Sequence, residues 1–242
     1  NDCIYLYADG SSNYSGAIKN VTIDVGNGNN TVSVGKYYSA TIDKISVNAG
    51  DGDDFITLKS TNVTIAGGAG DNTIQNYGDN ATIVAGAGAD YVSVYGANAN
   101  INVDAGDNTV CSNGDNTKIT TAGGKDYIYN YGANVTINAG DDTSADTVYN
   151  YGSNAVIAVG GGDNYVYNSG SKLTVTSGAG DDTISNYSAG GTISVDAGNG
   201  DNEIKINTNT SSTVNSAKIS VGAGNDCIYL YADGSSNYSG AI

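Results

Sequence analysis

The feature of this sequence that most constrains its fold is a glycine-rich turn that returns every 18 residues or slightly more. Each turn ends in Asp or Asn, and Ile or Val follows two residues later. These anchor residues are Asp2, Asn30, Asp54, Asn72, Asp90, Asn108, Asp126, Asp146, Asn164, Asp182, Asn202 and Asp226. A period of this length, kept along a whole chain, is typical of a solenoid in which each coil packs on the next.

Each coil contains two short runs in which apolar and polar residues alternate, as strands require. The apolar positions form two rows of β-branched residues, which suit a pleated, half-buried surface. The first row is Ile4, Val32, Ile56, Ile74, Val92, Val110, Ile128, Val148, Val166, Ile184, Ile204 and Ile228, and the second is Ile23, Ile45, Ile65, Ile83, Ile101, Ile119, Ile137, Ile157, Val175, Ile193 and Ile219. The sequence therefore predicts an all-β, parallel two-sheet β-solenoid, similar to a β-roll, with 18-residue coils.

Composition agrees with a thin core and excludes several partners. The chain has 35 Gly and no Pro, Met, Trp, His or Arg, so few bulky groups are available for a wide core. Its formal charge is -16, and Glu203 is the only acidic residue that is not Asp. Such a charge disfavours nucleic acid and anionic membranes as partners and favours divalent cations. No run of 18 apolar residues occurs, so we expect no membrane span.

A second, longer period lies above the coil. Residues 1–18 are identical to residues 225–242, which indicates a tandem unit of 224 residues with about 11 coils. We expect residues 1–242 to form a single continuous β-solenoid. The sequence starts inside a turn and stops within a coil without polar capping units, so we expect an excerpt of a tandem array or a unit of an open polymer. Coils about 4.8 Å apart would give a fibre with an axial repeat of roughly 50 Å.

Extra residues and cysteines are placed unevenly. The three long coils receive most of their additional residues after the first strand, at residues 8–20, 35–44 and 207–218. These additions predict either a protruding ridge once per unit or tolerated surface loops. Cys3 and Cys111 would lie about five coils apart, too far for a disulfide. The cysteines are then surface thiols or, alternatively, form bonds between neighbouring fibres.

The glycine-rich turns resemble the RTX calcium-binding nonapeptide, G-G-x-G-x-D-x-U-x. The best matches are GAGNDCI at 222–228, GAGDDTI at 178–184, GDGDDFI at 50–56 and GAGADYV at 86–92. Proteins of that family are secreted bacterial toxins, enzymes, adhesins and surface-layer proteins, whose β-rolls fold when calcium binds between adjacent turns. The resemblance thus implies a calcium-binding β-roll in an extracellular or cell-surface protein.

The sequence departs from the family pattern in two ways. The second turn of each coil carries Asn, and Asn also interrupts the Asp row of the first turn, so part of the expected ion sites is missing. Partial occupancy by calcium is one solution, and hydrogen bonds between amides and carboxylates without metal are another. The candidate calcium ligands are Asp53, Asp54, Asp71, Asp90, Asp107, Asp126, Asp146, Asp163, Asp181, Asp182, Asp201 and Asp226.

Three further rows are periodic. Asn76, Asn130, Asn150, Asn168 and Asn186 share the inward phase and predict a buried asparagine ladder. Asn62, Asn80, Asn98, Asn116, Asn134 and Asn154 occupy the second turn, where Asn tolerates a left-handed backbone. Tyrosines such as Tyr129, Tyr149, Tyr167, Tyr77, Tyr95, Tyr131, Tyr151 and Tyr187 point outward. They predict stacking between coils or, alternatively, an adhesive face for fibre bundling or carbohydrate.

These features favour a structural function, namely a subunit or repeat of an extracellular filament or of the stalk of a giant surface adhesin. Its expected partner is the chain itself, with a carbohydrate or surface receptor as a further option. The alternative is a calcium-responsive RTX-type module of a secreted protein, and an ice-binding solenoid is a minor one. With no His, no Arg and one Glu, no cluster of acid and base residues breaks the repeat, and we expect no enzyme.

Overall fold

The computed structural model describes residues 1–10, 16–37, 39–188, 190–208 and 214–232. In these residues it contains strands and turns and no helix, and therefore no helix that could span a membrane. Odd-numbered strands belong to one parallel sheet of 12 strands and even-numbered strands to another of 11 strands. The predicted parallel β-solenoid is confirmed. The chain divides into two compact units, unit 1 (Asn1–Lys118) and unit 2 (Ile119–Ile242), which are described separately.

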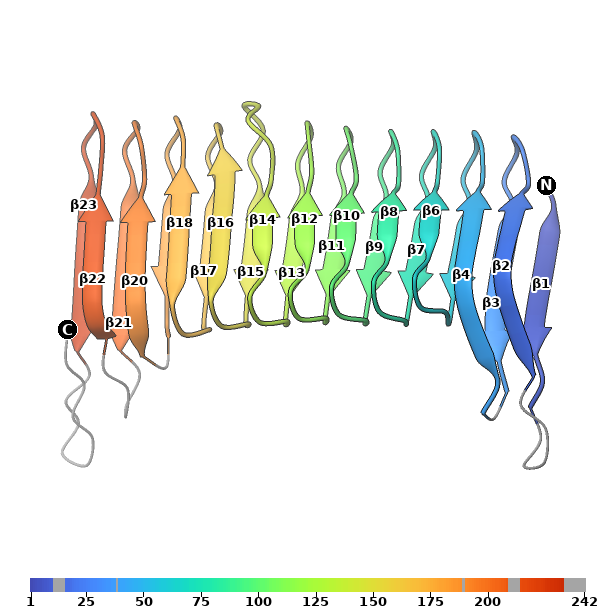
Figure 1. Cartoon of the computed structure of the whole chain (residues 1–242). Helices are drawn as coiled ribbons and strands as arrows, with labels where there is room; N and C mark the ends of the chain where they lie inside the picture. The colour runs from blue at the N-terminus through green and yellow to red at the C-terminus, as the bar shows by residue number, and fades with distance from the viewer. Residues whose placement is uncertain (11–15, 38, 189, 209–213, 233–242) are drawn as a thin grey trace. The chain divides into compact units, whose positions relative to one another are not determined.

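Unit 1 alternates between its two sheets at every turn of the chain, as the blue to green ribbon of Figure 1 shows. The odd-numbered strands are β1 (Cys3–Ala8), β3 (Thr31–Lys36), β5 (Phe55–Leu58), β7 (Thr73–Asn76), β9 (Tyr91–Val94) and β11 (Thr109–Ser112). The even-numbered strands are β2 (Ala17–Asp24), β4 (Thr41–Asn48), β6 (Thr64–Ala66), β8 (Thr82–Val84) and β10 (Asn100–Asn102). β12 (Lys118–Thr120) lies where unit 1 gives way to unit 2.

Unit 2 repeats this alternation. Its odd-numbered strands are β13 (Tyr127–Asn130), β15 (Thr147–Asn150), β17 (Tyr165–Asn168), β19 (Thr183–Asn186), β21 (Glu203–Thr208) and β23 (Cys227–Ala232). Its even-numbered strands are β14 (Thr136–Asn138), β16 (Ala155–Gly160), β18 (Leu173–Ser177), β20 (Gly191–Asp196) and β22 (Val214–Ser220). Equivalent residues of successive coils pair directly, for example Ile128 with Val148 and Val148 with Val166.

The two β-branched rows form the core. Ile56, Ile74 and Val92 of the odd-numbered strands and Ile65 and Ile101 of the even-numbered strands have 0% of their surface exposed. Small residues and the turns close the core at its two edges. At the outer strands the burial is weaker: Ile4 is half-buried and Ile228 is 44% exposed. Burial therefore depends on a neighbouring coil on both sides, as expected for a solenoid.

The asparagine ladder is confirmed. Asn130, Asn150, Asn168 and Asn186 are fully buried and pair in register through β13, β15, β17 and β19. The Nδ2 of Asn130 donates to the Oδ1 of Asn150 at 2.6 Å, and the next two pairs repeat the contact. Each of these donors also reaches a turn carbonyl, such as Gly132 O at 2.8 Å from Asn130. Asn76 in unit 1 is equally buried but contacts only its turn, through Gly78 O.

The second turn has the predicted left-handed backbone. Asn62, Asn80, Asn98, Asn116, Asn134 and Asn154 all have φ between 54° and 59°. Lysine takes the same conformation at Lys44 and Lys172, which the sequence pattern did not predict. Outside the core, the tyrosines stack as expected: Tyr77 lies on Tyr95 with ring centroids 4.7 Å apart and planes at 1°, and Tyr131 lies on Tyr151 at 4.9 Å.

The predicted ridge falls partly on residues 11–15, 38 and 209–213, which lie outside the described residues. In the described part, the additional residues lengthen strands. β2 and β4 have eight residues each, whereas β6 has three. Residues 233–242, the end of the second copy of the repeated segment (225–242), also lie outside the described residues. The ridge and the single continuous solenoid stay predictions.

Candidate cation site at the glycine-rich turns

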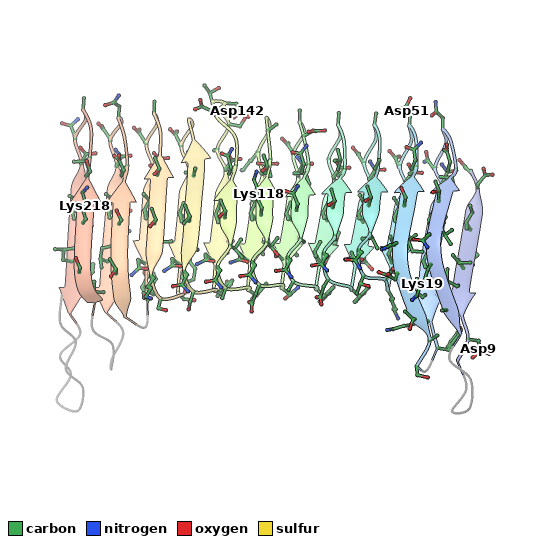
Figure 2. The ribbon with its side chains drawn as sticks, viewed as in Figure 1. Asp9, Lys19, Asp51, Lys118, Asp142 and Lys218 are labelled. Atoms are coloured by element: carbon green, nitrogen blue, oxygen red, sulfur yellow. The ribbon has the colours of Figure 1, made fainter. Side chains whose placement is uncertain are left out.

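The glycine-rich turns stack so closely that glycine is required. Gly86 has φ +101°, and a Cβ on it would lie 1.6 Å from the carbonyl oxygen of Gly68 in the preceding coil. Backbone hydrogen bonds join the turns, as from Gly70 N to Ala87 O at 2.8 Å. The turns thus form one edge of each unit, where Figure 2 shows Asp51 in unit 1 and Asp142 in unit 2. This edge is where the sequence predicts calcium.

The anchor residues form a continuous hydrogen-bond ladder within each unit. In each coil the backbone N–H of the anchor donates to the side-chain Oδ1 of the next anchor. Asn72 N donates to Asp90 Oδ1 at 2.9 Å, and Asp90 N donates to Asn108 Oδ1 at 3.0 Å. In unit 2, Asp146 and Asn164 repeat the contact at 2.9 Å. Asp and Asn are interchangeable for this bond because both have an Oδ1 acceptor.

The second polar atom of the anchor side chain, Nδ2 in Asn and Oδ2 in Asp, distinguishes the two residue types. In Asn72 the Nδ2 donates to Gly70 O at 3.0 Å and Ala85 O at 3.2 Å, so the amide satisfies turn carbonyls. The Oδ2 atoms of Asp54, Asp90 and Asp182 are buried at the equivalent position and receive no hydrogen bond. These side chains are only 1–2% exposed. The Oδ2 of an ionised carboxylate would be buried there without a donor, which is costly.

Burial accordingly raises the pKa of these carboxyl groups. It raises the pKa of Asp90 to about 6, and the charges of Asp71 and Asp104 add to the effect. It raises the pKa of Asp146 to about 7, helped by Asp126 and Asp142. The pKa values of Asp54 and Asp182 are raised for the same first cause. These carboxyl groups therefore keep their protons to a higher pH than an ordinary Asp, since Coulomb repulsion and desolvation act in the same direction.

A second row of carboxylates lies outside the ladder. The exposed residues Asp53, Asp71, Asp107, Asp163, Asp181 and Asp201 each precede an anchor. Their Oδ1 atoms also accept backbone N–H groups of the next coil, as Asp71 does from Ala89 at 2.7 Å and Asp181 from Asp201 at 2.7 Å. A backbone hydrogen bond from Asn225 lowers the pKa of Asp201. Asp201 is therefore held as an ionised acceptor.

The donor set does not fit the calcium ion that the resemblance implies. Calcium takes six to eight oxygens, with several carboxylates among them. In the described residues, no three or more carboxylates or thiols converge on one point. Along the ladder, Asn amides place N–H groups in the turns that neighbour Asp54, Asp90 and Asp182. Asp126 and Asp146 are the only consecutive acidic anchors, and Asp226 is half-buried against Asn202. Calcium at this edge stays a prediction.

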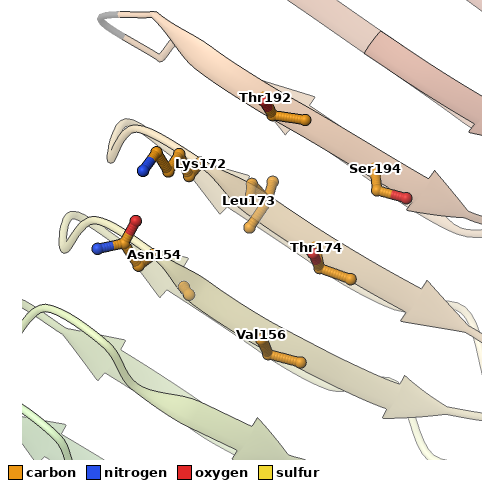
Figure 3. Close-up of a pocket in the computed structure, with 8 residues that line it drawn as sticks. Asn154, Val156, Lys172, Leu173, Thr174, Thr192 and Ser194 are labelled. Carbon is orange, nitrogen blue, oxygen red and sulfur yellow. The ribbon is translucent and has the colours of Figure 1, made fainter. Parts of the chain in front are cut away.

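Unit 2 also carries a shallow hollow on the outer face of its even-numbered sheet, shown in Figure 3. Its volume is 250 Å³, and Val156, Thr174 and Ser194 lie across it on β16, β18 and β20. Lys172 and Leu173 also line this hollow. Neither a carboxylate nor a thiol lines it in the described residues, so it offers no acid and base pair.

The tyrosine rows cover the outer face of the odd-numbered sheet in unit 2. Tyr129 stacks on Tyr149 at 5.1 Å, and Tyr167 stacks on Tyr187 at 5.5 Å. Because the ring faces contact one another, ring edges and hydroxyl groups are what remains for a partner. The cysteines carry no disulfide: Cys3 and Cys227 are exposed, and Cys111 lies 3.9 Å from the Tyr91 hydroxyl. Burial raises the pKa of Cys111.

Comparisons with known proteins add no relative. A scan against protein-family models, a search of curated proteins and a search of solved structures each returned no match for this chain. The similarity to RTX repeats therefore rests on the turn motif alone.

Proposed function

We propose that this chain is a structural repeat of an extracellular fibre, filament or surface-adhesin stalk, which continues head to tail through the segment that it carries twice. The proposal includes no catalytic role, no nucleic-acid partner and a location at the cell surface or outside the cell. It is supported by the strand edges of β1 and β23, which have the same sequence, CIYLYA.

The identical strands use opposite edges in their two positions. At β1, the carbonyl of Asp2 accepts a hydrogen bond from Thr31 N at 2.7 Å, in the following coil. At β23, the N–H of Cys227 donates to Asn202 O at 2.8 Å, in the preceding coil. Six residue pairs join each strand to its neighbour. One copy of this segment can therefore hold β21 on one edge and β3 on the other at the same time.

Because this segment can pair on both of its edges, the strand ladder can continue from one 224-residue tandem unit to the next. The exposed surfaces of Ile228, at 44%, and Leu230, at 52%, would be covered by the next coil, as the equivalent residues Val32 and Val34 are in β3. Burying such side chains contributes roughly 1.5–3 kcal/mol each, which favours continuation over a free end. The junction between two tandem units would thus repeat contacts that already join β1 to β3 and β21 to β23.

The decisive experiment is cryo-electron microscopy of the native assembly. If one copy of the segment joins successive tandem units, the eleven coils of each tandem unit give continuous density with an axial repeat of roughly 50 Å. Leu230→Pro removes an N–H and the side chain from the edge of β23, and filaments should be lost. Leu230→Val keeps the strand and should keep filaments. Discrete rods for the native protein, or filaments that survive Leu230→Pro, would reject the proposal.

The calcium-responsive module remains the alternative function, and it makes a separate demand. Such a chain should lose its β-sheet circular dichroism in chelator and regain it on titration with calcium. The ladder of the anchor residues favours retention of the fold, because its contacts need no ion. An ice-binding role would require an unbroken threonine array, and the register interrupts it where Thr136 pairs with Val156.

A further inference from the structure

Unit 1 contains a step where a long coil meets a regular one. β3 and β4 belong to the coil of 24 residues between Asn30 and Asp54, and they extend beyond β5 and β6, as Figure 1 shows. A pocket of 430 Å³ lies at this step, and its described lining is Lys36, Ile42, Lys59, Ser60, Thr61, Tyr77, Gly78 and Asp79. The step exists because the additional residues lengthen one pair of strands and not the next.

Two lysines converge on the pocket without a carboxylate partner. Lys36 ends β3, Lys59 follows β5, and both side chains are exposed. Neither Lys36 nor Lys59 forms an ion pair within 4.0 Å with a described residue. In a chain with formal charge -16, two unpaired ammonium groups at one hollow are unusual. They make the pocket a site for an anion.

The neighbouring acids are already engaged elsewhere. The carboxylate of Asp43 accepts hydrogen bonds from Asn62 Nδ2 at 2.6 Å and Thr61 Oγ1 at 3.1 Å. These bonds lower its pKa, and the charges of Lys44 and Lys19 contribute. Asp79, which lines the pocket, accepts from Ala97 N at 2.8 Å. Neither carboxylate therefore forms an ion pair with Lys36 or Lys59.

An aromatic ring completes the site. Tyr77 is 43% exposed, and one face of its ring is covered by Tyr95 at 4.7 Å. Lys59 occupies the position equivalent to Tyr77 in the preceding coil. Its Nζ lies 5.7 Å from the centroid of the Tyr77 ring. The face of Tyr77 turned away from Tyr95 therefore looks toward Lys59 and the pocket. Such a face suits the C–H side of a sugar ring, as apolar walls do in ligand sites.

We propose that this step pocket binds an acidic sugar, a hexose unit that carries a carboxylate or a sulfate. The anionic group contacts Lys36 and Lys59, the sugar ring packs on Tyr77, and the half-exposed Thr61 hydroxyl oxygen accepts from a sugar hydroxyl. This assignment goes beyond the proposed fibre, because it gives each repeat a binding site for an acidic polysaccharide. It needs only residues of unit 1, so it does not depend on assembly.

The test is isothermal titration calorimetry of the full chain with three probes in chelator at low salt. The probes are a trigalacturonate, which carries carboxylates, a sulfated galactan oligosaccharide, and the neutral galactan of equal length. We expect binding of at least one acidic probe and none of the neutral one. The acidic probe that binds more tightly identifies the preferred anion.

Matched variants locate the site. The double variant Lys36→Ala/Lys59→Ala should lower affinity at least tenfold, and Tyr77→Ala should lower it several-fold, with the β-sheet circular dichroism unchanged. Lys118→Ala removes an exposed lysine of β12, outside the pocket, and should leave affinity unchanged. The proposal is overturned if no acidic probe binds, if the neutral galactan binds equally, or if Lys118→Ala has the effect of the double variant. Loss of filaments in Leu230→Pro with sugar binding retained would separate this inference from the fibre.

Discussion

Replacing Asp90 by Asn tests the role of the buried anchor ladder. Asp90 is 2% exposed, its Oδ1 accepts from Asn72, and its Oδ2 has no partner. Burial raises its pKa from an ordinary value of 3.8 to about 6. The folded chain therefore binds more protons than the unfolded chain between these two values. Stability is highest below the unfolded pKa, falls as the pH rises toward 6, and stays lower above it.

The magnitude follows from the shift. Two pKa units correspond to about 3 kcal/mol of folding free energy at 1.36 kcal/mol per unit. An Asn at this position keeps the Oδ1 acceptor and supplies a donor to the turn carbonyls, as Asn72 does. We therefore expect Asp90→Asn to stabilise the chain by about 2–3 kcal/mol at pH 8 and by little at pH 3.5.

The assay is urea unfolding followed by circular dichroism at both pH values, with chelator present. No lysine occurs in the turn of Asp90 or in the turns before and after it, which carry Asp71, Asp104 and Asp107. Asp71→Asn is the matched control, since it removes the same charge from an exposed side chain and keeps the acceptor for Ala89 N. Its effect should be within about 0.5 kcal/mol.

Two outcomes would refute this reasoning. The first is an Asp90→Asn variant that is no more stable than the native chain at pH 8. The second is stabilisation of the native chain by calcium that the variant lacks, because a cation would then hold the Oδ2 in place of a proton. The latter result would support the calcium prediction for this turn.

Two further substitutions test the packing of the coils. Asn150→Ala removes hydrogen bonds to Gly152 O and to the next amide of the ladder, and should lower the free energy of unfolding in urea by about 3–5 kcal/mol. The control Asn138→Ala changes an exposed side chain and should alter stability by less than about 0.5 kcal/mol. Gly86→Ala should cost more than about 4 kcal/mol or prevent folding, since its Cβ meets a carbonyl oxygen at 1.6 Å. Gly26→Ala, with no atom within 4 Å and φ +63°, should cost only about 1–2 kcal/mol, and equal costs for the two glycines would contradict the stacking geometry.

Much of the fold was predictable because the solenoid repeats one local rule. The inward phase of residues such as Ile128 and Asn130 follows from alternation alone, and stacking in register follows from the constant period. The left-handed Asn98 was also predictable, because few other residues tolerate that conformation. Each of these features depends on residues within one coil or on its equivalent in the next.

The site was less accessible to sequence reasoning. The motif places Asp90 on a turn, but burial of its side chain and capture of its Oδ1 by Asn72 N depend on how closely the turns stack. The step pocket brings Lys36 and Lys59 together from coils of different length, which a repeat alignment treats as an insertion. A comparison of coil lengths with the positions of the nine lysines is the signal that could have indicated it.

The ladders that join successive coils also determine how such a unit bears load. Their hydrogen bonds run from coil to coil, so tension along that direction opens one ladder at a time rather than shearing several together. A coil of 18 residues released in this way would lengthen the chain by about 60 Å. A filament built from these units would then yield in small increments of one coil each and dissipate a sudden pull, while the coils beyond the break stay folded.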